Sequence, residues 1–299
     1  MAVLDRVDGS GVVRTYDVQV DPTVSVRVIE KSASDHAPIA LLVHGLGVGG
    51  RYWDLSGTGY STMDHLVGMG LRACALDHRG YGGSTPVPGS TVRAAAATRD
   101  VVAVIDHLRA GQHSSGVCLV GHSWGGIVAT IVAATHPESV ESLVLLGMPY
   151  RRLHPVFQQR VALLRAACTD PDGWMPNPTH IGLEERLCAF EPEVLTAYEE
   201  MVGTEYPRIP IGVLDDCIEL PHVEHVERLA CPVLVVCGDA ETVVDRSDML
   251  NLLDDLPTPD KGLMFVGRAG HLTVLEKHAH VTVDRLVSDW ALRRRAGGA

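Results

Sequence analysis

A serine stands among three glycines in the segment VGHSWGGIV, residues 120–128, directly after the apolar run 117–120. Glycines at the junction of a strand and a helix indicate a tight turn or a close approach of two backbones. Such a turn would lift the hydroxyl of Ser123 out of the edge of a sheet. A serine hydroxyl is a weak nucleophile until a neighbouring imidazole accepts its proton. The segment therefore predicts nucleophilic chemistry if the chain also supplies a histidine and a carboxylate.

Carboxylates and a histidine follow two later apolar runs. Asp239, Glu241 and Asp245 lie at and after the end of CPVLVVCGD, and His271 ends the run KGLMFVGRAGH. A carboxylate that accepts a hydrogen bond from one imidazole nitrogen keeps the other nitrogen ready to take the serine proton. The chain order is serine, acid, histidine. These residue types predict a Ser–acid–His triad, with the choice of the acid still open at this point.

Elements that could position these residues are visible as six continuous apolar runs, which predict buried strands. The runs are residues 38–45, 71–80, 116–123, 141–149, 231–239 and 261–271. Helical spacing between or after them predicts helices that include 101–108, 127–134 and 283–290. Residues 11–30 alternate apolar and polar side chains, which predicts a β-hairpin. Buried strands that alternate with helices predict a mostly parallel sheet whose carboxyl ends bring the three candidate residues together.

One long interval lacks a buried strand. Between Pro149 and Cys231, helix-like pieces such as PVFQQRVALLRAAC, EERLCAF and EPEVLTAYEEMVG alternate with proline-rich joints. Connections between strands in such sheets are usually much shorter. We therefore expect a core formed by residues 1–149 and 226–299, with residues 150–225 as a helical cap, or lid, over one end of the sheet.

Four segments resemble the α/β-hydrolase family. HGLG (44–47) matches the family's oxyanion loop and DHRGYGGS (77–84) its D-x-R-G-x-G-x-S segment. GHSWGG (121–126) matches its nucleophile elbow, and AGHLTVLE (269–276) its histidine segment. The resemblance implies the α/β-hydrolase fold, with a mostly parallel central sheet, helices on both faces and a helical cap.

The same resemblance implies roles for five residues. Ser123 would be the nucleophile, His271 the general base, and the backbone N–H groups of Leu46 and Trp124 the oxyanion hole. The family usually places its acid as G-x-x-D, and Glu241 stands in that register after Gly238. Asp239 is the alternative acid, because it lies nearer the strand end. We interpret Asp245 as a residue of the following loop or of the cap.

Other polar residues receive structural interpretations. His44 is expected to support the oxyanion loop, and Arg79 to pair with a loop carboxylate or with carbonyl groups. The histidine groups HVEH (222–225) and EKHAH (276–280) lack an HExxH motif or a cysteine pair, so we expect no metal and no cofactor. Trp174 and Met175 fit a substrate pocket or the cap's own apolar core equally well.

Composition limits the possible partners. The net charge of −12 argues against binding to nucleic acid or to an anionic membrane surface. No stretch approaches the ~20 apolar residues of a membrane span, and the start MAVLDRVDGSG lacks the apolar core of a signal peptide. The seven cysteines form no CxxC pair, which predicts buried free thiols. We therefore expect a cytoplasmic protein whose partner is a small molecule.

The expected reaction is attack on a carbonyl, through an acyl-enzyme that water then hydrolyses. By resemblance, a serine at the elbow excludes epoxide hydrolases and dehalogenases, in which the family uses aspartate there. We expect a serine hydrolase of carboxylic esters with small or medium acyl substrates. Thioester, lactone, amide and C–C bonds remain open, and the alternative of another class is a ligand-binding homologue without turnover.

Overall fold

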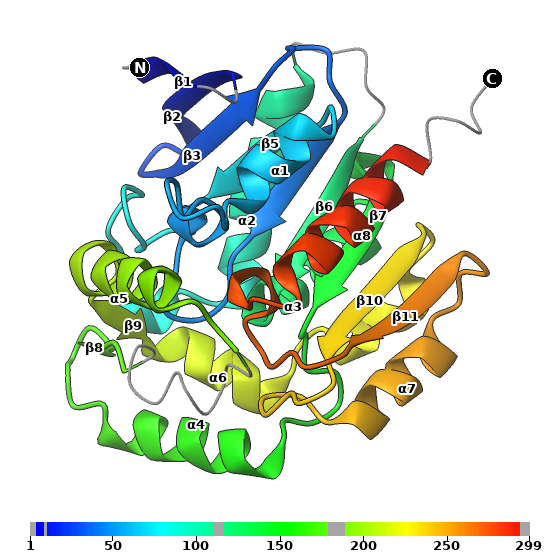
Figure 1. Cartoon of the computed structure of the whole chain (residues 1–299). Coiled ribbons are helices and arrows are strands. Elements are labelled where there is room, and N and C mark those ends of the chain that lie inside the picture. Colours follow the sequence, from blue (N-terminus) through cyan, green and yellow to red (C-terminus); the bar gives the residue numbers. More distant parts are fainter. Residues whose placement is uncertain (1–3, 9–10, 111–115, 179–188, 294–299) are drawn as a thin grey trace.

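The computed structural model describes residues 4–8, 11–110, 116–178 and 189–293. Its centre is a nine-stranded sheet in the order β1-β2-β3-β5-β4-β6-β7-β10-β11 (Figure 1). The strands from β5 to β11 pair in parallel, whereas β1, β2 and β3 are antiparallel. The strands are β1 (Leu4–Asp8), β2 (Gly11–Asp21), β3 (Val24–Ser32), β4 (Ile39–Val43), β5 (Arg72–Leu76), β6 (Val117–His122), β7 (Val140–Leu146), β10 (Val233–Gly238) and β11 (Lys261–Val266).

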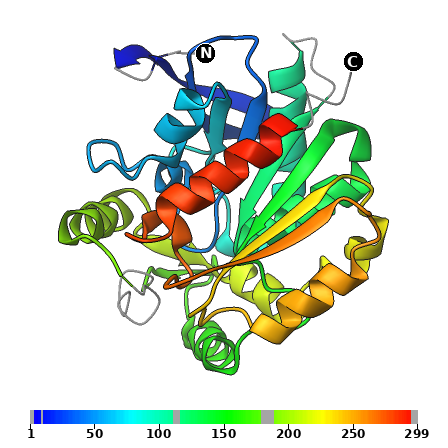
Figure 2. The same ribbon diagram turned by 45° about the vertical axis from the view of Figure 1, so that its right-hand side comes forward.

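Helices cover both faces of this sheet. Helices α1 (Thr62–Gly68) and α8 (His280–Arg293) lie together across one face, whereas α2 (Ala94–Arg109) and α3 (Trp124–Thr135) pack on the other (Figures 1 and 2). Helix α7 (Arg246–Asp255) packs against the two strands β10 and β11. This arrangement is a parallel sheet buried on both faces, which explains why its strands are continuous apolar runs.

The predicted strands are present. Each of the six apolar runs forms one strand, and every residue of β4, β6 and β10 is buried. The prediction of a buried strand was wrong for β11, which buries only Val266 because it lies at the edge of the sheet. The predicted hairpin is formed by β2 and β3, whose turn is closed by Asp21: its Oδ1 accepts from the backbone N–H groups of Thr23 and Val24 at 2.9 and 3.0 Å. An aspartate at this position supports a turn through such side-chain bonds.

The interval 150–225 contains three helices and one short ribbon. The helices are α4 (Pro155–Ala167), α5 (Pro192–Glu205) and α6 (Ile211–Glu219), and β8 (Trp174–Pro176) pairs with β9 (Arg208–Pro210). They lie together at the end of the sheet where the parallel strands finish (Figure 1). The predicted helical piece EERLCAF lies mostly outside the described residues. The interval is called the insertion below.

Outside the insertion, the strand β1 and the helices α1 and α7 were not predicted; within it, α6, β8 and β9 were not predicted either. Helix α1 has only seven residues, and its start is marked by Ser61, which accepts from the N–H of Asp64 at 3.0 Å. Helix α7 buries only Asp248, Met249 and Leu252 among its ten residues. Short or mostly polar helices produce little hydrophobic periodicity, and this is why no pattern marked these segments.

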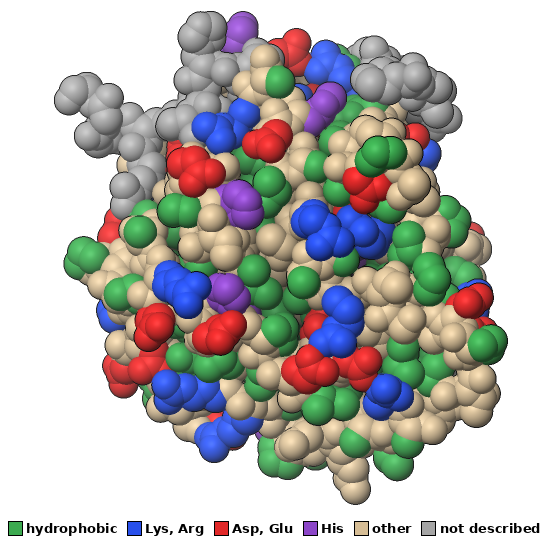
Figure 3. All heavy atoms as spheres, turned by 180° about the vertical axis from the view of Figure 1, so that it is seen from behind, with side chains coloured by type: hydrophobic (Ala, Val, Ile, Leu, Met, Phe, Trp, Pro, Cys, Tyr) green, Lys and Arg blue, Asp and Glu red, His purple; other side chains and the backbone are tan. Residues whose placement is uncertain are grey.

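The described cysteines are free thiols, as the absence of a CxxC pair predicts. Six described cysteines are free, and all of them except Cys168 are buried. Burial raises the pKa of Cys118 and of Cys217 to about 12, so both thiols stay protonated. On the face opposite to Figure 1, acidic and basic side chains are interspersed (Figure 3). Among the described helices, none is both long and apolar enough to cross a membrane.

Candidate active site

Ser123 occupies a sharp turn between β6 and α3. Its φ is 55° and its ψ is −121°, a backbone conformation that costs an L-residue free energy. Its neighbours on both sides are buried, and the serine itself is only 8% exposed. The turn ends the strand and places the serine at the edge where β4, β6 and β7 all finish. A non-glycine residue with such a backbone is typical of a functional turn.

The three glycines around the serine permit close packing, and none of them has a positive φ. A Cβ on Gly121 would lie 2.5 Å from the carbonyl oxygen of Gly125. A Cβ on Gly125 would lie 2.3 Å from the carbonyl oxygen of Val43, at the end of β4. A Cβ on Gly126 would lie 2.7 Å from Met148. Of the two expectations for these glycines, a tight turn or a close approach, all three therefore serve the close approach, and the strained residue of the turn is the serine.

His271 and Glu241 lie against each other at the ends of β11 and β10. The distance from Nδ1 of His271 to Oε2 of Glu241 is 2.9 Å, and both side chains are more than nine-tenths buried. Oε1 of the same carboxylate accepts from the N–H groups of Thr242 and Val243 at 2.8 and 2.7 Å. Backbone donors thus fix the carboxylate while it contacts the imidazole.

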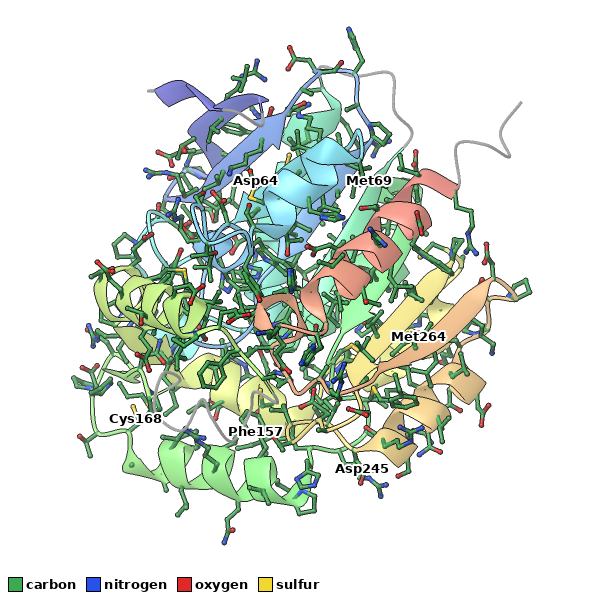
Figure 4. All side chains as sticks on the ribbon, in the orientation of Figure 1. Asp64, Met69, Phe157, Cys168, Asp245 and Met264 are labelled. Carbon is green, nitrogen blue, oxygen red and sulfur yellow. The ribbon has the colours of Figure 1, made fainter. Side chains whose placement is uncertain are left out.

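The two neighbouring aspartates have other partners. Oδ1 of Asp239 accepts from the N–H of Ala269 at 3.3 Å, and the residue is exposed. Asp245 caps the start of α7 by accepting from the N–H of Ser247 at 2.8 Å (Figure 4). Of the three candidate carboxylates, the structure therefore brings Glu241 to His271.

Two further residues shape the surroundings of His271 and were missed in the sequence. Gly147 follows β7 with φ 52°, and a Cβ there would lie 3.1 Å from Nδ1 of His271 and 3.2 Å from Oε2 of Glu241. Glu276 is buried and accepts from the N–H of Gly270 with both oxygens at 2.9 Å. The only sequence signal for Glu276 is its place in AGHLTVLE, and Gly147 has none.

The predicted oxyanion donors lie beside the serine. A Cβ on Gly45 would approach Cβ of Ser123 to 3.0 Å, so the peptide group that carries the N–H of Leu46 passes close to the serine. The carbonyl of that peptide group accepts from Nδ1 of His44 at 2.9 Å, and Nε2 of His44 accepts from the N–H of His78 at 3.1 Å. Because a trans peptide is planar, fixing the carbonyl also fixes the N–H on its opposite side. This geometry agrees with the interpretation of His44 as support for the loop.

Trp124 supplies the second predicted donor from the first position of α3. The first N–H groups of a helix have no acceptor within the helix. The indole of Trp124 is held by Asp216 of α6, whose Oδ2 lies 3.0 Å from Nε1. The same carboxylate accepts from the N–H of Ala94 at 2.6 Å and from Nε of Arg93 at 2.7 Å. Burial raises the pKa of Asp216, and Arg93 opposes this effect.

His122 connects the serine turn to the histidine loop. Its Nε2 donates to the backbone oxygen of His271 at 3.0 Å, and its ring stacks on Tyr52 with centroids 5.0 Å apart. Burial lowers the pKa of His122 to about 3, so the ring is neutral near pH 7. Its role was not predicted, although the residue directly precedes the serine.

A small cavity of about 30 Å³ opens on Ser123 and His271. This volume holds one or two water molecules. Side chains from the core and from the insertion share its wall, and Phe157 lies on the side of α4 that faces the core (Figure 4). Among the described residues, the wall is apolar apart from His122, Ser123, Arg160, Tyr198 and His271; its apolar members are Leu46, Val48, Phe157, Leu164, Pro178, Ile209, Val243 and Leu272.

Trp174 and Met175 are absent from the described wall of this cavity. Both line a separate surface hollow near Arg208.

Arg79 pairs with Asp100, at 2.5 Å from Nη2 to Oδ1. Asp100 belongs to helix α2, whereas a loop carboxylate or carbonyl groups were expected as the partner of Arg79.

The two histidine groups are engaged in packing. The ring of His222 packs edge-on against Tyr150, and His280 packs against Tyr60 with centroids 3.9 Å apart. Over the described ranges, no group of three or more His, Cys, Asp or Glu residues has the arrangement of a metal site.

Comparison with known proteins extends these observations. The family model described as "Serine aminopeptidase, S33" matches residues 35–278. A 2-hydroxy-6-oxononadienedioate/2-hydroxy-6-oxononatrienedioate hydrolase of Burkholderia vietnamiensis is 28% identical, with 85% of this chain and 86% of that protein covered. A monoacylglycerol lipase of Mycolicibacterium smegmatis is 24% identical over 85% of this chain and 88% of its own. The crystal structure of Paleococcus ferrophilus monoacylglycerol lipase shares the fold, with a TM-score of 0.67, 24% identity and coverage of 87% and 96% of the two chains.

Proposed function

Since the chain belongs to the family described as "Serine aminopeptidase, S33" and has the α/β-hydrolase fold, we propose that it is a serine hydrolase of carboxylic esters. Ser123 is the nucleophile, His271 the general base and Glu241 the acid of the triad. The N–H groups of Leu46 and Trp124 form the oxyanion hole. No metal or cofactor takes part in this proposal.

One observation carries the proposal. Ser123 and His271 line the same cavity, and Glu241 occupies Nδ1 of His271 at 2.9 Å, so that Nε2 is the nitrogen left for the serine proton. The strained backbone of Ser123 supports the same interpretation, because strain of this kind persists where function requires it.

The reaction follows from these groups. Oγ of Ser123 attacks the ester carbonyl carbon while Nε2 of His271 takes its proton, and the charge on the carbonyl oxygen is stabilised by the two N–H donors. The tetrahedral intermediate then collapses, and the imidazolium gives its proton to the leaving alcohol. Water repeats the sequence on the acyl-enzyme and releases the acid. Glu241 stabilises the imidazolium at both stages.

We propose further that the insertion is a cap that determines substrate size. Phe157, Arg160 and Leu164 of α4 face Ser123 across a cavity too small for an acyl chain. A substrate therefore requires displacement of α4 or of a neighbouring segment. The mostly apolar wall favours aliphatic acyl groups, because it offers few partners for polar ones.

Hydrolysis of a C–C bond in a dioate substrate is the second candidate function. The Burkholderia vietnamiensis relative, which aligns over most of both chains, supports this candidate. A second support is Arg160 in the cavity wall, because a guanidinium binds the carboxylates of such a substrate well.

The test combines labelling and turnover. A fluorophosphonate probe should label the wild type, and the Ser123→Ala variant should lose both labelling and hydrolysis of p-nitrophenyl esters. A series of acyl chain lengths then reports the size limit set by the insertion. Faster turnover of a 2-hydroxy-6-oxo-dienedioate than of every ester would favour the second candidate. Undiminished ester hydrolysis by Ser123→Ala would exclude the proposal.

A further inference from the structure

One side chain of the insertion is bonded directly to the loop that carries the predicted oxyanion donor. Nδ2 of Asn177 lies 2.7 Å from the carbonyl oxygen of Gly47 and 2.6 Å from that of Tyr206. The residue is only 4% exposed. Its NH₂ group has two hydrogens, one for each carbonyl, and the reverse orientation of the amide would place an oxygen against both acceptors. The side chain is therefore a fixed bridge between the insertion and residues 45–48.

Asn177 is itself firmly held. It follows β8 directly, and its backbone N–H donates to the carbonyl oxygen of Pro207 at 2.9 Å, which continues the pairing of β8 with β9. The ribbon is tied to the core at a separate point, where Nε1 of Trp174 donates to the carbonyl oxygen of Val87 at 2.9 Å. The carboxamide thus projects from a braced segment, and it can position what it binds.

The loop around Leu46 is tethered on both sides. The Gly45–Leu46 peptide is held by His44 of the core, through the Gly45 carbonyl. The Gly47–Val48 peptide is held by Asn177 of the insertion, through the Gly47 carbonyl. Gly47 has φ 77°, so the chain reverses sharply between the two tethers. Release of the second tether would let the loop rotate and shift the N–H of Leu46.

We propose that Asn177 is a positioning residue for the oxyanion hole, so that the insertion, besides covering the substrate, holds the core loop in its catalytic geometry. The proposal rests on the function proposed above. An oxyanion donor acts on the charge that develops in the transition state, and a misplaced donor lowers kcat while substrate binding changes little. Loss of Asn177 should therefore separate kcat from KM.

Two variants test this bridge. Asn177→Leu removes both hydrogen bonds at similar volume, and kcat for p-nitrophenyl butyrate should fall about 10- to 100-fold with KM nearly unchanged. Affinity for a trifluoromethyl ketone, which forms a tetrahedral adduct on the serine, should fall by the same factor. Glu191→Gln is the control: it removes a different contact between the insertion and the core, the ion pair with Lys277 at 2.6 Å, and both quantities should stay near wild type.

Asn177→Asp adds a second measurement, the pH dependence of kcat. A residue that only stabilised the fold would leave this pH dependence as it is in the wild type. An ionised carboxylate cannot donate to the two carbonyls, whereas the protonated acid can donate to one of them. The ratio of its kcat to that of the wild type should therefore rise as the pH falls, whereas the ratio for Asn177→Leu should stay flat. This comparison also decides the question if Asn177→Leu does not fold.

The outcomes are distinguishable. Wild-type kcat and ketone affinity in a folded Asn177→Leu, or a pH-independent ratio for Asn177→Asp, would overturn the role of Asn177 and leave the proposed hydrolase intact. Hydrolysis by the wild type that does not depend on Ser123 would overturn both. A rise in KM alone would also contradict the inference, because it would assign Asn177 to substrate binding.

Discussion

The carboxylate of Glu241 and the imidazole of His271 meet at the ends of two adjacent parallel strands, with 2.9 Å between Oε2 and Nδ1. The two residues are 30 positions apart, and the pairing of β10 with β11 brings their loops together. Both carboxylate oxygens have partners, since Oε1 accepts from two backbone N–H groups. The longer side chain of glutamate therefore reaches the imidazole without losing its support.

We predict that Glu241→Gln lowers kcat by roughly 10³- to 10⁴-fold, because an amide cannot stabilise the imidazolium and favours the wrong tautomer of His271. Asp239→Asn is the matched control, and it should retain most activity because Asp239 contacts Ala269 and is exposed. Steady-state hydrolysis of a p-nitrophenyl ester measures both, with circular dichroism to verify folding. A larger loss in Asp239→Asn would reverse the assignment of the acid.

The sequence is sufficient to predict this pair because each partner follows a continuous apolar run. Such runs become parallel strands whose carboxyl ends meet at one edge, so the pattern alone places Ser123 and His271 at that edge. The register after Gly238 then favours Glu241 over Asp239. Local pattern and topology together thus predict the sheet and the centre of the candidate site.

Residues that support the site from a distance could not be found in this way. Asn177 lies 130 positions from Gly47, and Asp216 lies 92 positions from Trp124. Both belong to the insertion, whose mixed helices and proline-rich joints predict no fixed position relative to the sheet. Their partners are a backbone carbonyl and an indole N–H, and neither leaves a motif. Contacts of this kind depend on tertiary packing, which periodicity does not encode.

Gly147 provides a second test of the geometry. An alanine there would adopt φ 52° and place its Cβ within 3.2 Å of both His271 and Glu241. The left-handed backbone alone costs roughly 1–2 kcal/mol, and a displacement of the imidazole by about 1 Å can lower the rate by about 10²-fold. We therefore predict that Gly147→Ala lowers the free energy of unfolding by only about 1–2 kcal/mol but lowers kcat by about 10²-fold.

Gly70→Ala separates the two effects of that substitution. Gly70 has φ 88°, and a Cβ there would meet no atom within 4 Å. This control should show a similar fall in thermal stability with normal kcat, as measured by thermal unfolding and ester hydrolysis. Equal losses of activity in both variants would mean that Gly147 acts through backbone strain alone.

Asp216 should matter chiefly for stability. It is 1% exposed and joins α6 to Arg93, Ala94 and Trp124. Its removal leaves the N–H groups of Trp124 and Ala94 without this acceptor, and an unsatisfied buried donor typically costs about 1–3 kcal/mol. We predict that Asp216→Leu lowers the free energy of unfolding by at least this amount.

Asp215→Leu is the control. The neighbouring Asp215 forms a partly exposed ion pair with Arg165, and such pairs contribute about 0–1 kcal/mol. Urea unfolding measures both, and similar values for the two variants would refute the bridging role.

The last prediction concerns Asp284 on α8, which has no part in the proposed triad. This aspartate is 3% exposed, and its Oδ1 has no partner among the described residues. Burial raises its pKa from 3.8 to about 7. Between these two values the unfolded chain has released the proton and the folded chain still holds it. Stability therefore falls as the pH rises through this window, by about 1.4 kcal/mol per pH unit, or about 4 kcal/mol in all.

Asp284→Asn removes this dependence, because the amide stays neutral at every pH. The variant should be more stable than the wild type at pH 8, by about 2–4 kcal/mol, and the difference should vanish near pH 4. Urea unfolding at a series of pH values measures the difference, in which the contributions of all other titrating groups cancel. Asp289→Asn, at an exposed position of the same helix, should show no such trend. A stability difference for Asp284→Asn that stays constant from pH 4 to pH 8 would mean that the buried carboxyl keeps its ordinary pKa.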